Sequence, residues 1–532
     1  MFCDIVVDLF LAALPIVFLI VVMTKPNPLP ATVAFSLAAA LAFTVRLSYF
    51  RTAFPLLSAA VISGLLDALT PISIVFGAIF FFVALEKSGA MDVLQEWLRE
   101  ISSNPVAQLM LVGWAFVFLI EGACGFGTPA ALAAPMLVGL GFPAMRVALL
   151  CIIFNATPTA FGAVGTPMWF GFELLELPQS ELIEIGAKTA VLQSIAALII
   201  PVVALRFVVD WGVIRRNLGF IYLSLLSCVV PMLAVAWINY EFPAVIGGVV
   251  GLIATILLAR FGIGLERQET AEPRRGPLLS VPVLVALTPL IVTVVILLVT
   301  RIPILGLRGL LTSPVPNLPI SLGGLGELTI SPSLVVQLRN ILGQGLDWSH
   351  AILYVPSIIP FLLTAVLAFL LFRSPTGTLP VALHETVGRI GKPVIALFGA
   401  LVFVNLLMIG GDRASTIILG DALASVAGGA WKYFAPFLGA LGSFFSGSTT
   451  ISNLTFGGIQ ASIAQDIGMD PGTLLALQCA GAAMGNMITI HNIVAVCAVL
   501  SLVNVEGEIL KKAFLPVILY GITLAAAAAV LF

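Results

Sequence analysis

Two clusters of small and polar residues interrupt long apolar stretches of the chain. The first cluster spans 121–167 and contains EGACGFGTP and, at its end, NATPTAFGAVGTP. The second cluster spans 442–492 and contains GSFFSGSTTISN and, at its end, GAAMGNMITIHN. Glycine and proline release backbone amides from helical pairing, and such amides at membrane depth must line a cavity or be buried in protein. The two clusters are therefore candidate parts of one binding site.

The chemistry of the clusters suits an anion. Amides at a new helix start carry partial positive charge and bind a carboxylate without a lysine or arginine in the bilayer. Close helix packing is the alternative explanation for the glycines, as in Gly481-x-x-x-Gly485, but two clusters in matching positions favour binding. The candidate substrate-binding residues are Gly125, Gly127, Thr128, Asn155, Thr157, Ser446, Ser448, Thr449, Asn453, Asn486 and Asn492.

Two ionisable residues in the clusters are candidates for proton coupling. Glu121 follows an uninterrupted apolar run and directly precedes the first glycine-rich break. Ionisable residues at membrane depth are costly and are functional candidates by default, although a carboxylate at the water interface that caps a helix is an alternative. His491 lies in the second break, where an imidazole can accept a proton or donate a hydrogen bond, and a structural role for it stays open.

The pair Asp412 and Arg413 follows an apolar run that ends at Ile409. It can be a buried ion pair, a clamp for a substrate carboxylate through Arg413, or a pair in an interfacial loop. Of these, we favour the loop.

The motifs of common enzymes and pumps are missing. The sequence has no P-loop, Rossmann fingerprint, H-E-x-x-H or G-x-S-x-G, so neither ATP-driven pumping nor catalysis is supported. The six cysteines have no C-x-x-C or Cys/His ligand spacing. We expect no enzymatic activity, no cofactor and no metal.

The composition identifies the elements that must position these residues. Of 532 residues, 60% are apolar and 9% are charged, against about 25% charged in an ordinary soluble domain. Apolar stretches long enough to cross a hydrocarbon core of roughly 30 Å recur from end to end. We predict an all-α polytopic membrane protein with about 12 to 14 transmembrane helices and two broken-helix or hairpin segments. The net charge of −2, without a basic block, makes a nucleic-acid partner unexpected.

The clusters also indicate an internal repeat. Acidic residues precede the apolar stretch near 187, whereas Lys511 and Lys512 precede the one near 513. Opposite flanks predict opposite orientations, hence an inverted repeat with a site between its broken helices. We predict an N-terminal half at 1–264, a central span and loop at 265–350, and a C-terminal half at 351–532.

Lysine and arginine in short loops orient the chain, because such loops stay cytoplasmic. The loops at 206–216, 260–275 and 373–392 are basic and are predicted to lie inside, and the acidic loop at 173–184 outside. Arg46 and Arg51 fit this scheme poorly.

In its clusters the sequence resembles the lactate permease family, proton-linked carriers of lactate, glycolate and related 2-hydroxy monocarboxylates. The chain differs from some members at Gly447-Ser-Thr-Thr450, where they carry Gly-Ser-Asp-Thr, and at Thr489-Ile-His491, where they carry Ser-Pro-Gln. The resemblance rests on residues 119–129, 137–142, 155–167 and 434–442 and on Ser446, Gly447, Ser448, Ser452, Asn453, Gln460 and Ala461.

The resemblance implies a secondary active transporter of a 2-hydroxy monocarboxylate, working by proton symport in a prokaryotic cytoplasmic (inner) membrane. An anion entering against an inside-negative potential works against about 2.3 kcal/mol per 100 mV, whereas symport with one proton is electroneutral. The expected partners are the monocarboxylate, the proton and the lipid bilayer, and a homo-oligomer is compatible with the sequence. A sodium-coupled carboxylate transporter and a passive anion channel stay open as alternatives.

Overall fold

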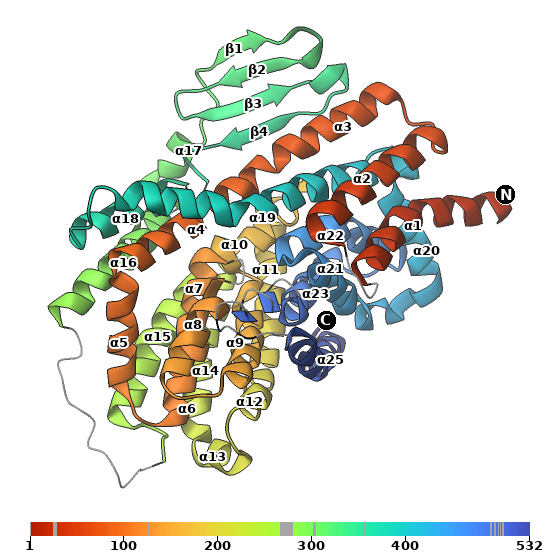
Figure 1. The fold of residues 1–532 in the computed structure, drawn as a ribbon. Coiled ribbons are helices and arrows are strands. Elements are labelled where there is room, and N and C mark those ends of the chain that lie inside the picture. The colour runs from red at the N-terminus through yellow and green to blue at the C-terminus, as the bar shows by residue number, and fades with distance from the viewer. Residues whose placement is uncertain are drawn as a thin grey trace. The chain divides into compact units, whose positions relative to one another are not determined.

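The chain forms two compact units, each made from two separate parts of the sequence (Figure 1). Unit 1 comprises Met1–Val93 and Val281–Ala422, and unit 2 comprises Leu94–Ser280 and Leu423–Phe532. The predicted halves at 1–264 and 351–532 follow sequence order, and each unit draws on both. The computed structural model describes all residues except 1, 25–28, 126–127, 267–279, 302–304, 356–357, 490–491, 494–495, 498–499, 501 and 503–504.

Unit 1 is a helical body with one small sheet. Its helix α19 packs against α2, α3 and α4, and α18 packs against α4 and α16. Inside, the Phe81 ring stacks on Phe361 with centroids 5.2 Å apart. Its helices are α1 (Phe2–Thr24), α2 (Ala31–Ser48), α3 (Phe54–Asp67), α4 (Leu69–Ser88), α16 (Val281–Arg301), α17 (Leu307–Leu311), α18 (Ile358–Leu371) and α19 (Thr378–Met408).

The central connection, which we predicted as a loop, contains a four-stranded antiparallel sheet. Its strands are β1 (Leu318–Ser321), β2 (Glu327–Ile330), β3 (Val335–Arg339) and β4 (Trp348–Ala351), and they pair in that order. Leu338 of β3 and Trp348 of β4 form a buried cluster with Ala59 of α3 and Ile341. One face of the sheet is therefore anchored by apolar packing on α3.

Arg46 is a buried cation rather than a loop residue. Its side chain is only 1% exposed, and its guanidinium donates to the carbonyls of Ile409 and Arg413, the latter at 2.6 Å. These carbonyls lie just beyond the C-terminal end of α19, where no further backbone amide of the helix is left to donate to them. Because Arg46 serves this role, its position says little about which loop faces the cytoplasm.

Unit 2 contains both clusters. Its helices are α6 (Pro105–Gln108), a π-helical segment (Leu109–Phe116), α7 (Val117–Cys124), α8 (Thr128–Gly139), α9 (Ala144–Thr159), α10 (Gly162–Trp169), α11 (Gln179–Ala197), α12 (Ile200–Leu205), α13 (Trp211–Arg216), α14 (Leu218–Ala236), α15 (Pro243–Phe261), α21 (Ala435–Ser446), α22 (Thr449–Asp466), α23 (Pro471–Gly485) and α25 (Glu506–Leu531). Helices α5 (Ala90–Ile101) and α20 (Ser415–Ala427) each begin in unit 1 and end in unit 2.

Some glycines of unit 2 serve close helix packing. A Cβ atom at Gly248 of α15 would lie 2.4 Å from Leu119 Cα of α7. A Cβ atom at Gly481 of α23 would lie 1.9 Å from the carbonyl oxygen of Pro436 in α21. The packing explanation therefore holds for these two positions, neither of which is a candidate binding residue.

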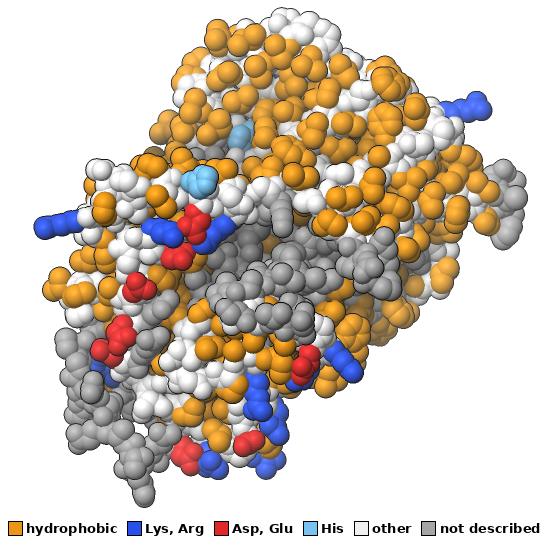
Figure 2. All heavy atoms as spheres, in the orientation of Figure 1, with side chains coloured by type: hydrophobic (Ala, Val, Ile, Leu, Met, Phe, Trp, Pro, Cys, Tyr) orange, Lys and Arg blue, Asp and Glu red, His pale blue; other side chains and the backbone are white. Residues whose placement is uncertain are grey.

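The helices agree with a polytopic membrane protein. By length and composition, five described helices can cross a bilayer, and two bent pairs raise this number to seven. Six shorter apolar helices of 10–17 residues accompany them in the described chain. Hydrophobic side chains cover much of the described surface on the face in Figure 2, and Val230 and Ile253 on long helices are more than half exposed. The predicted total of 12 to 14 spans and the inverted repeat stay predictions.

Candidate functional site

Both clusters meet at one small cavity inside unit 2. The helix ends that surround it belong to α7, α9, α10, α21, α22 and α23. The space open to the centre of a water molecule is about 20 Å³, enough for about one water. The cavity is lined by Glu121, Gly125, Thr159, Gly162, Ala163, Pro167, Gly447, Ser448, Thr449, Thr450 and Asn486.

The first break ends α7 at Gly125. Its φ of 66° is left-handed, and its amide donates to the carbonyl of Glu121 at 3.0 Å. A Cβ atom here would approach the Ala163 methyl group to 2.9 Å, so both the backbone turn and the contact require glycine. Of the other predicted residues nearby, Gly127 and the side chain of Thr128 lie outside the described part of the structure.

The break between α9 and α10 bends this pair of helices by 53°. Ala163, Val164 and Gly165 all have positive φ, at 44°, 57° and 70°. The Thr166 hydroxyl donates to the Ala163 carbonyl at 2.5 Å, and the Trp169 indole donates to the Val164 carbonyl at 3.2 Å. Side chains thus hold a left-handed turn that is unfavourable for valine.

Glu121 projects its carboxyl group into this break. The residue is 1% exposed, and its carboxyl group interacts with the side chains of Asn155 and Thr159. A Cβ atom at Gly162 would lie 2.6 Å from Glu121 Oε1, so the carboxyl group packs directly against the Gly162 backbone. Within the described residues, Glu121 Oε2 and Asn155 Oδ1 are buried without a hydrogen-bond partner.

The second break provides a helix start. Gly447 turns the chain with a φ of 73°, and Ser448 Oγ accepts a hydrogen bond from the Ile451 amide at 3.3 Å. The amides of Thr449 and Thr450 belong to the first turn of α22, where no helical carbonyl precedes them. Ser446 Oγ accepts from the Ser448 amide at 3.2 Å and so shapes the turn. This helix start is an anion-binding arrangement.

Asn453 joins the two clusters behind the cavity. Its side-chain amide donates to the Pro167 carbonyl at 2.9 Å, while its Oδ1 is buried without a partner in the described chain. The adjacent Ser452 hydroxyl donates to the Gly439 carbonyl at 2.7 Å and accepts from Gln478 Nε2 at 3.0 Å. Asn453 therefore positions Pro167, which lines the cavity, without lining it itself.

Asn486 and Asn492 act together at the end of α23. Asn492 Nδ2 donates to Asn486 Oδ1, and Asn486 lines the cavity. The Thr489 hydroxyl donates to the Ser443 carbonyl at 3.2 Å, which ties this segment to α21. His491 lies outside the described residues.

The remaining candidates lie away from the cavity. Thr157 faces Tyr520, whose hydroxyl interacts with it and donates to Gln193 Oε1. Asp412 and Arg413 form an exposed 3₁₀ turn in unit 1, and Arg413 Nη2 lies 3.3 Å from Asp8 Oδ1. This geometry agrees with the favoured loop interpretation.

Six lining residues were not among the candidates: Thr159, Gly162, Ala163, Pro167, Gly447 and Thr450. Three of them belong to the GAVGTP segment. Its glycines and proline predicted the break, but they did not indicate which residues of the turn face the cavity. Thr450 follows the candidate Thr449 directly, and the helix register that exposes both to the cavity begins at Ser448.

Comparison with known proteins reveals extensive similarity. A family model described as L-lactate permease matches residues 8–532. A Haemophilus influenzae protein named as a candidate L-lactate permease is 46% identical over 512 residues, covering 96% of each chain. The L-lactate permease of Escherichia coli K12 is 28% identical and the glycolate permease of the same organism 25% identical, each covering 94% of this chain and 91% of the relative. Among solved structures, the YdaH transporter of Alcanivorax borkumensis matches with a TM-score of 0.41 at 13% identity, covering 88% of this chain and 87% of that one.

Proposed function

Because the chain belongs to the L-lactate permease family, we propose that it carries lactate, glycolate or a related 2-hydroxy monocarboxylate across the membrane by proton symport. Family membership makes it a transporter rather than an enzyme. The observation that supports the coupling is a buried carboxyl group, Glu121, in the same cavity as a free helix start. We place the protein in the cytoplasmic membrane of a prokaryote.

The substrate carboxylate binds at the start of α22. The amides of Thr449 and Thr450 and the hydroxyls of Ser448 and Thr449 provide donors, and the helix dipole favours negative charge there. Thr449 Oγ1 is buried without a partner in the described structure, which leaves it available for a ligand. No lysine or arginine stands among the described residues that line the cavity.

The 2-hydroxyl group is recognised by amide and hydroxyl side chains opposite this helix start. Asn486 and Thr159 line the cavity. The Asn486 side-chain amide can donate to an alcohol, and Thr159 Oγ1, whose proton is donated to the Asn155 carbonyl at 2.5 Å, can accept from one. Asn155 positions Thr159, because its Nδ2 donates to Thr159 Oγ1 at 3.3 Å. A 2-hydroxy acid is therefore preferred over the acid without the hydroxyl.

Glu121 carries the coupled proton. The substrate anion and the Glu121 carboxyl group share one small cavity, so an ionised carboxylate repels the substrate and a protonated one does not. Burying a carboxylate with an oxygen that lacks a donor is also costly. Substrate and proton therefore enter the site together.

Transport requires the cavity to open. Room for about one water is too little for a molecule with six non-hydrogen atoms. The structure thus corresponds to a closed state, and the substrate enters when the helix breaks around the cavity separate.

Uptake of labelled lactate into proteoliposomes tests this function. An inward proton gradient should drive accumulation above the external concentration, and Glu121→Gln should abolish that accumulation. Glu181→Gln, at an exposed acid in α11, is the matched control. Unchanged proton-driven uptake by Glu121→Gln would remove this residue from the mechanism.

The same vesicles separate the alternatives. Accumulation that depends on a sodium gradient and not on a proton gradient indicates a sodium-coupled carrier. Flux that neither saturates nor accumulates substrate indicates a channel. A parallel measurement with propionate, which lacks the 2-hydroxyl group, tests the role assigned to Asn486 and Thr159.

A further inference from the structure

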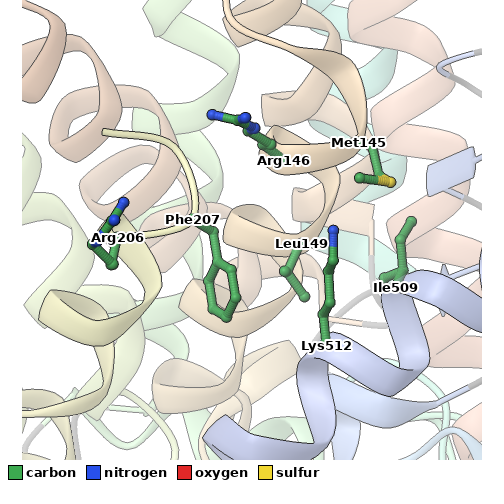
Figure 3. A pocket seen from close by; sticks show the side chains of 7 residues that line it. All are labelled: Met145, Arg146, Leu149, Arg206, Phe207, Ile509 and Lys512. Atoms are coloured by element: carbon green, nitrogen blue, oxygen red, sulfur yellow. The ribbon is translucent and has the colours of Figure 1, made fainter. Parts of the chain in front are cut away.

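A second and larger cavity lies within unit 2, at the opposite end of α9 from the candidate site (Figure 3). Its space open to the centre of a water molecule is about 240 Å³. The ends of three helices form it: the start of α9, the end of α12 and the start of α25. We call this cavity the basic pocket, and it is lined by Met145, Arg146, Leu149, Arg206, Phe207, Ile509 and Lys512.

Three cationic side chains from three helix ends line the basic pocket. Arg206 pairs with Asp210 at 3.6 Å, and Lys512 pairs with Glu508 at 2.8 Å. Both acids are neighbours one helical turn away and are half or more exposed, so these pairs are weak. Arg146 is exposed and has no acidic partner within the described residues. The local balance of charge thus suits an anion of one negative charge.

The start of α9 adds backbone donors. The helix has 16 residues and begins after Pro143 without a side-chain cap. Its first-turn amides therefore lack helical partners, and its dipole favours an anion at this end. These amides and the Arg146 guanidinium belong to the same end of α9, at the pocket.

Two partly exposed apolar side chains, Met145 and Phe207, stand beside the cations. Leu149 and Ile509 are buried, and Met145 and Phe207 are partly buried. A soluble inorganic ion gains nothing from contact with apolar side chains, whereas an amphiphile buries its own apolar surface against them. The lining therefore favours an anion that is attached to an apolar molecule.

The basic pocket stands at the boundary of the apolar segments. One candidate span ends at Leu205, next to Arg206, and another begins at Gly507, before Lys512. The basic loop that follows Arg206 is predicted to face the cytoplasm, where anionic lipids gather and bind in basic pockets between helices.

We infer that the basic pocket binds the phosphate group of an anionic phospholipid from the cytoplasmic leaflet. The guanidinium of Arg146 and the ammonium of Lys512 bind the phosphate oxygens, assisted by Arg206 and the first amides of α9. Glycerol and the upper acyl chain contact the partly exposed side chains of Met145 and Phe207. The bound lipid bridges α9 and α25, and α9 also carries Asn155 and Thr159 of the candidate site.

Lipid retention tests this inference directly. The full-length protein, purified in mild detergent, is exposed to phosphatidylglycerol or phosphatidylcholine, and bound lipid is counted by native mass spectrometry. We expect selective retention of phosphatidylglycerol and about tenfold weaker binding in Arg146→Gln/Lys512→Gln, because each lost contact is a charge-assisted hydrogen bond. Arg215→Gln, at an exposed arginine beyond the pocket, is the matched control and should bind normally.

Further measurements distinguish a phospholipid from inorganic phosphate and from lactate as the bound anion. Protection against thermal unfolding by inorganic phosphate, without selective lipid retention, supports a phosphate site but overturns the lipid assignment. Protection by lactate that requires Arg146 and Lys512 overturns the inference in favour of a substrate vestibule. Equal phosphatidylglycerol retention by the double variant and the wild type also overturns it. Proton-driven uptake in phosphatidylcholine vesicles shows that the double variant is folded, and it tests the proposed function separately.

Discussion

The central cavity and the basic pocket are two proposed anion-binding sites within one helical unit. The central cavity has room for about one water and is lined by hydroxyls, amides and one carboxyl group, with no lysine or arginine. The basic pocket is an order of magnitude larger and has three cationic side chains. Helix α9 reaches both.

The difference follows from the cost of burying charge. A permanent cation at membrane depth is expensive and would hold an anion too firmly for rapid release. Backbone donors at a helix start attract the anion without a net charge. At the boundary with water, cations cost little, and tight, lasting binding of a lipid is useful. The depth of each site in the membrane, rather than the charge of its ligand, determines whether its donors are backbone amides or cationic side chains.

The largest effect on the free energy of unfolding is expected when a cation is placed in the central cavity. Thr450 is 7% exposed at the start of α22. Thr450→Lys should lower the free energy of unfolding by about 3 kcal/mol, the order of the cost of a charge at membrane depth. Lys512→Gln in the basic pocket should change it by less than about 1 kcal/mol. Unfolding in a denaturing detergent series measures both, and equal effects would break the comparison.

A smaller effect is expected from one added methyl group at the cavity. In Gly162→Ala the new Cβ would lie 2.6 Å from Glu121 Oε1, so the carboxyl group must move. Initial rates of proton-driven lactate uptake should fall about tenfold, as misplacement of a functional group by about 1 Å costs at least this much. A Cβ atom at Gly507 would meet no other residue within 4 Å, so the control variant Gly507→Ala should transport normally. Normal uptake by Gly162→Ala would show that Glu121 tolerates displacement.

A partly exposed ion pair should contribute less still. Asp470 caps α23 by accepting from the Thr473 amide at 2.8 Å, and Lys188 Nζ lies 2.5 Å from its carboxylate. Asp470→Ala should cost about 1 kcal/mol, the value of a helix cap, and leave substrate affinity unchanged. Asp466→Ala, at an exposed acid in α22, should cost almost nothing. A loss of affinity in Asp470→Ala would extend the functional site to this edge.

The smallest effect concerns a buried histidine in the sheet of unit 1. Burial lowers the pKa of His350 below its ordinary value of 6.5, and its Nδ1 lies 2.8 Å from the Thr70 hydroxyl. The unfolded state then binds more protons than the native state below pH 6.5, so stability is complete above that pH and falls as the pH drops toward the lowered native pKa. Amide exchange of β3 and β4 should accelerate over this range.

Two histidine variants check the assignment. His350→Gln should remove the acid sensitivity of exchange in the sheet. His384→Gln, at an exposed histidine in α19, should keep it. Acid sensitivity that survives in His350→Gln would point to another group.

Much of the site was predictable because breaks in apolar helices have a local signature. Glycine at 125 and 447 marked both turns, and both have the left-handed backbone that glycine favours. The isolated Glu121 marked the carboxyl group, because little else ionisable stands at that depth in the sequence. These features depend on a few neighbouring residues and need no knowledge of distant contacts.

The direction of side chains around each turn was not predictable. Thr157 and Thr159 are two residues apart, yet one faces Tyr520 and the other the cavity. Val164 adopts a left-handed conformation that its branched side chain disfavours, so only the surrounding packing fixes that turn. Long-range contacts determine both, and they are invisible to local patterns.

The sheet of unit 1 was not predicted from the sequence either. Its strands have only four or five residues, too short for a clear alternation. Glycine and proline around them indicated a loop. Pairing across the sheet and packing on Ala59 of α3 stabilise strands that local propensity leaves undecided.

The contact of Asn453 with Pro167 has a kinetic consequence. The two residues belong to different clusters, and their hydrogen bond holds Pro167, which lines the cavity. Any opening that separates them breaks this bond first, and a net bond energy of about 1 kcal/mol slows opening roughly fivefold. In the proposed transport cycle, this one side-chain amide therefore slows turnover, and in exchange it limits the leakage of protons.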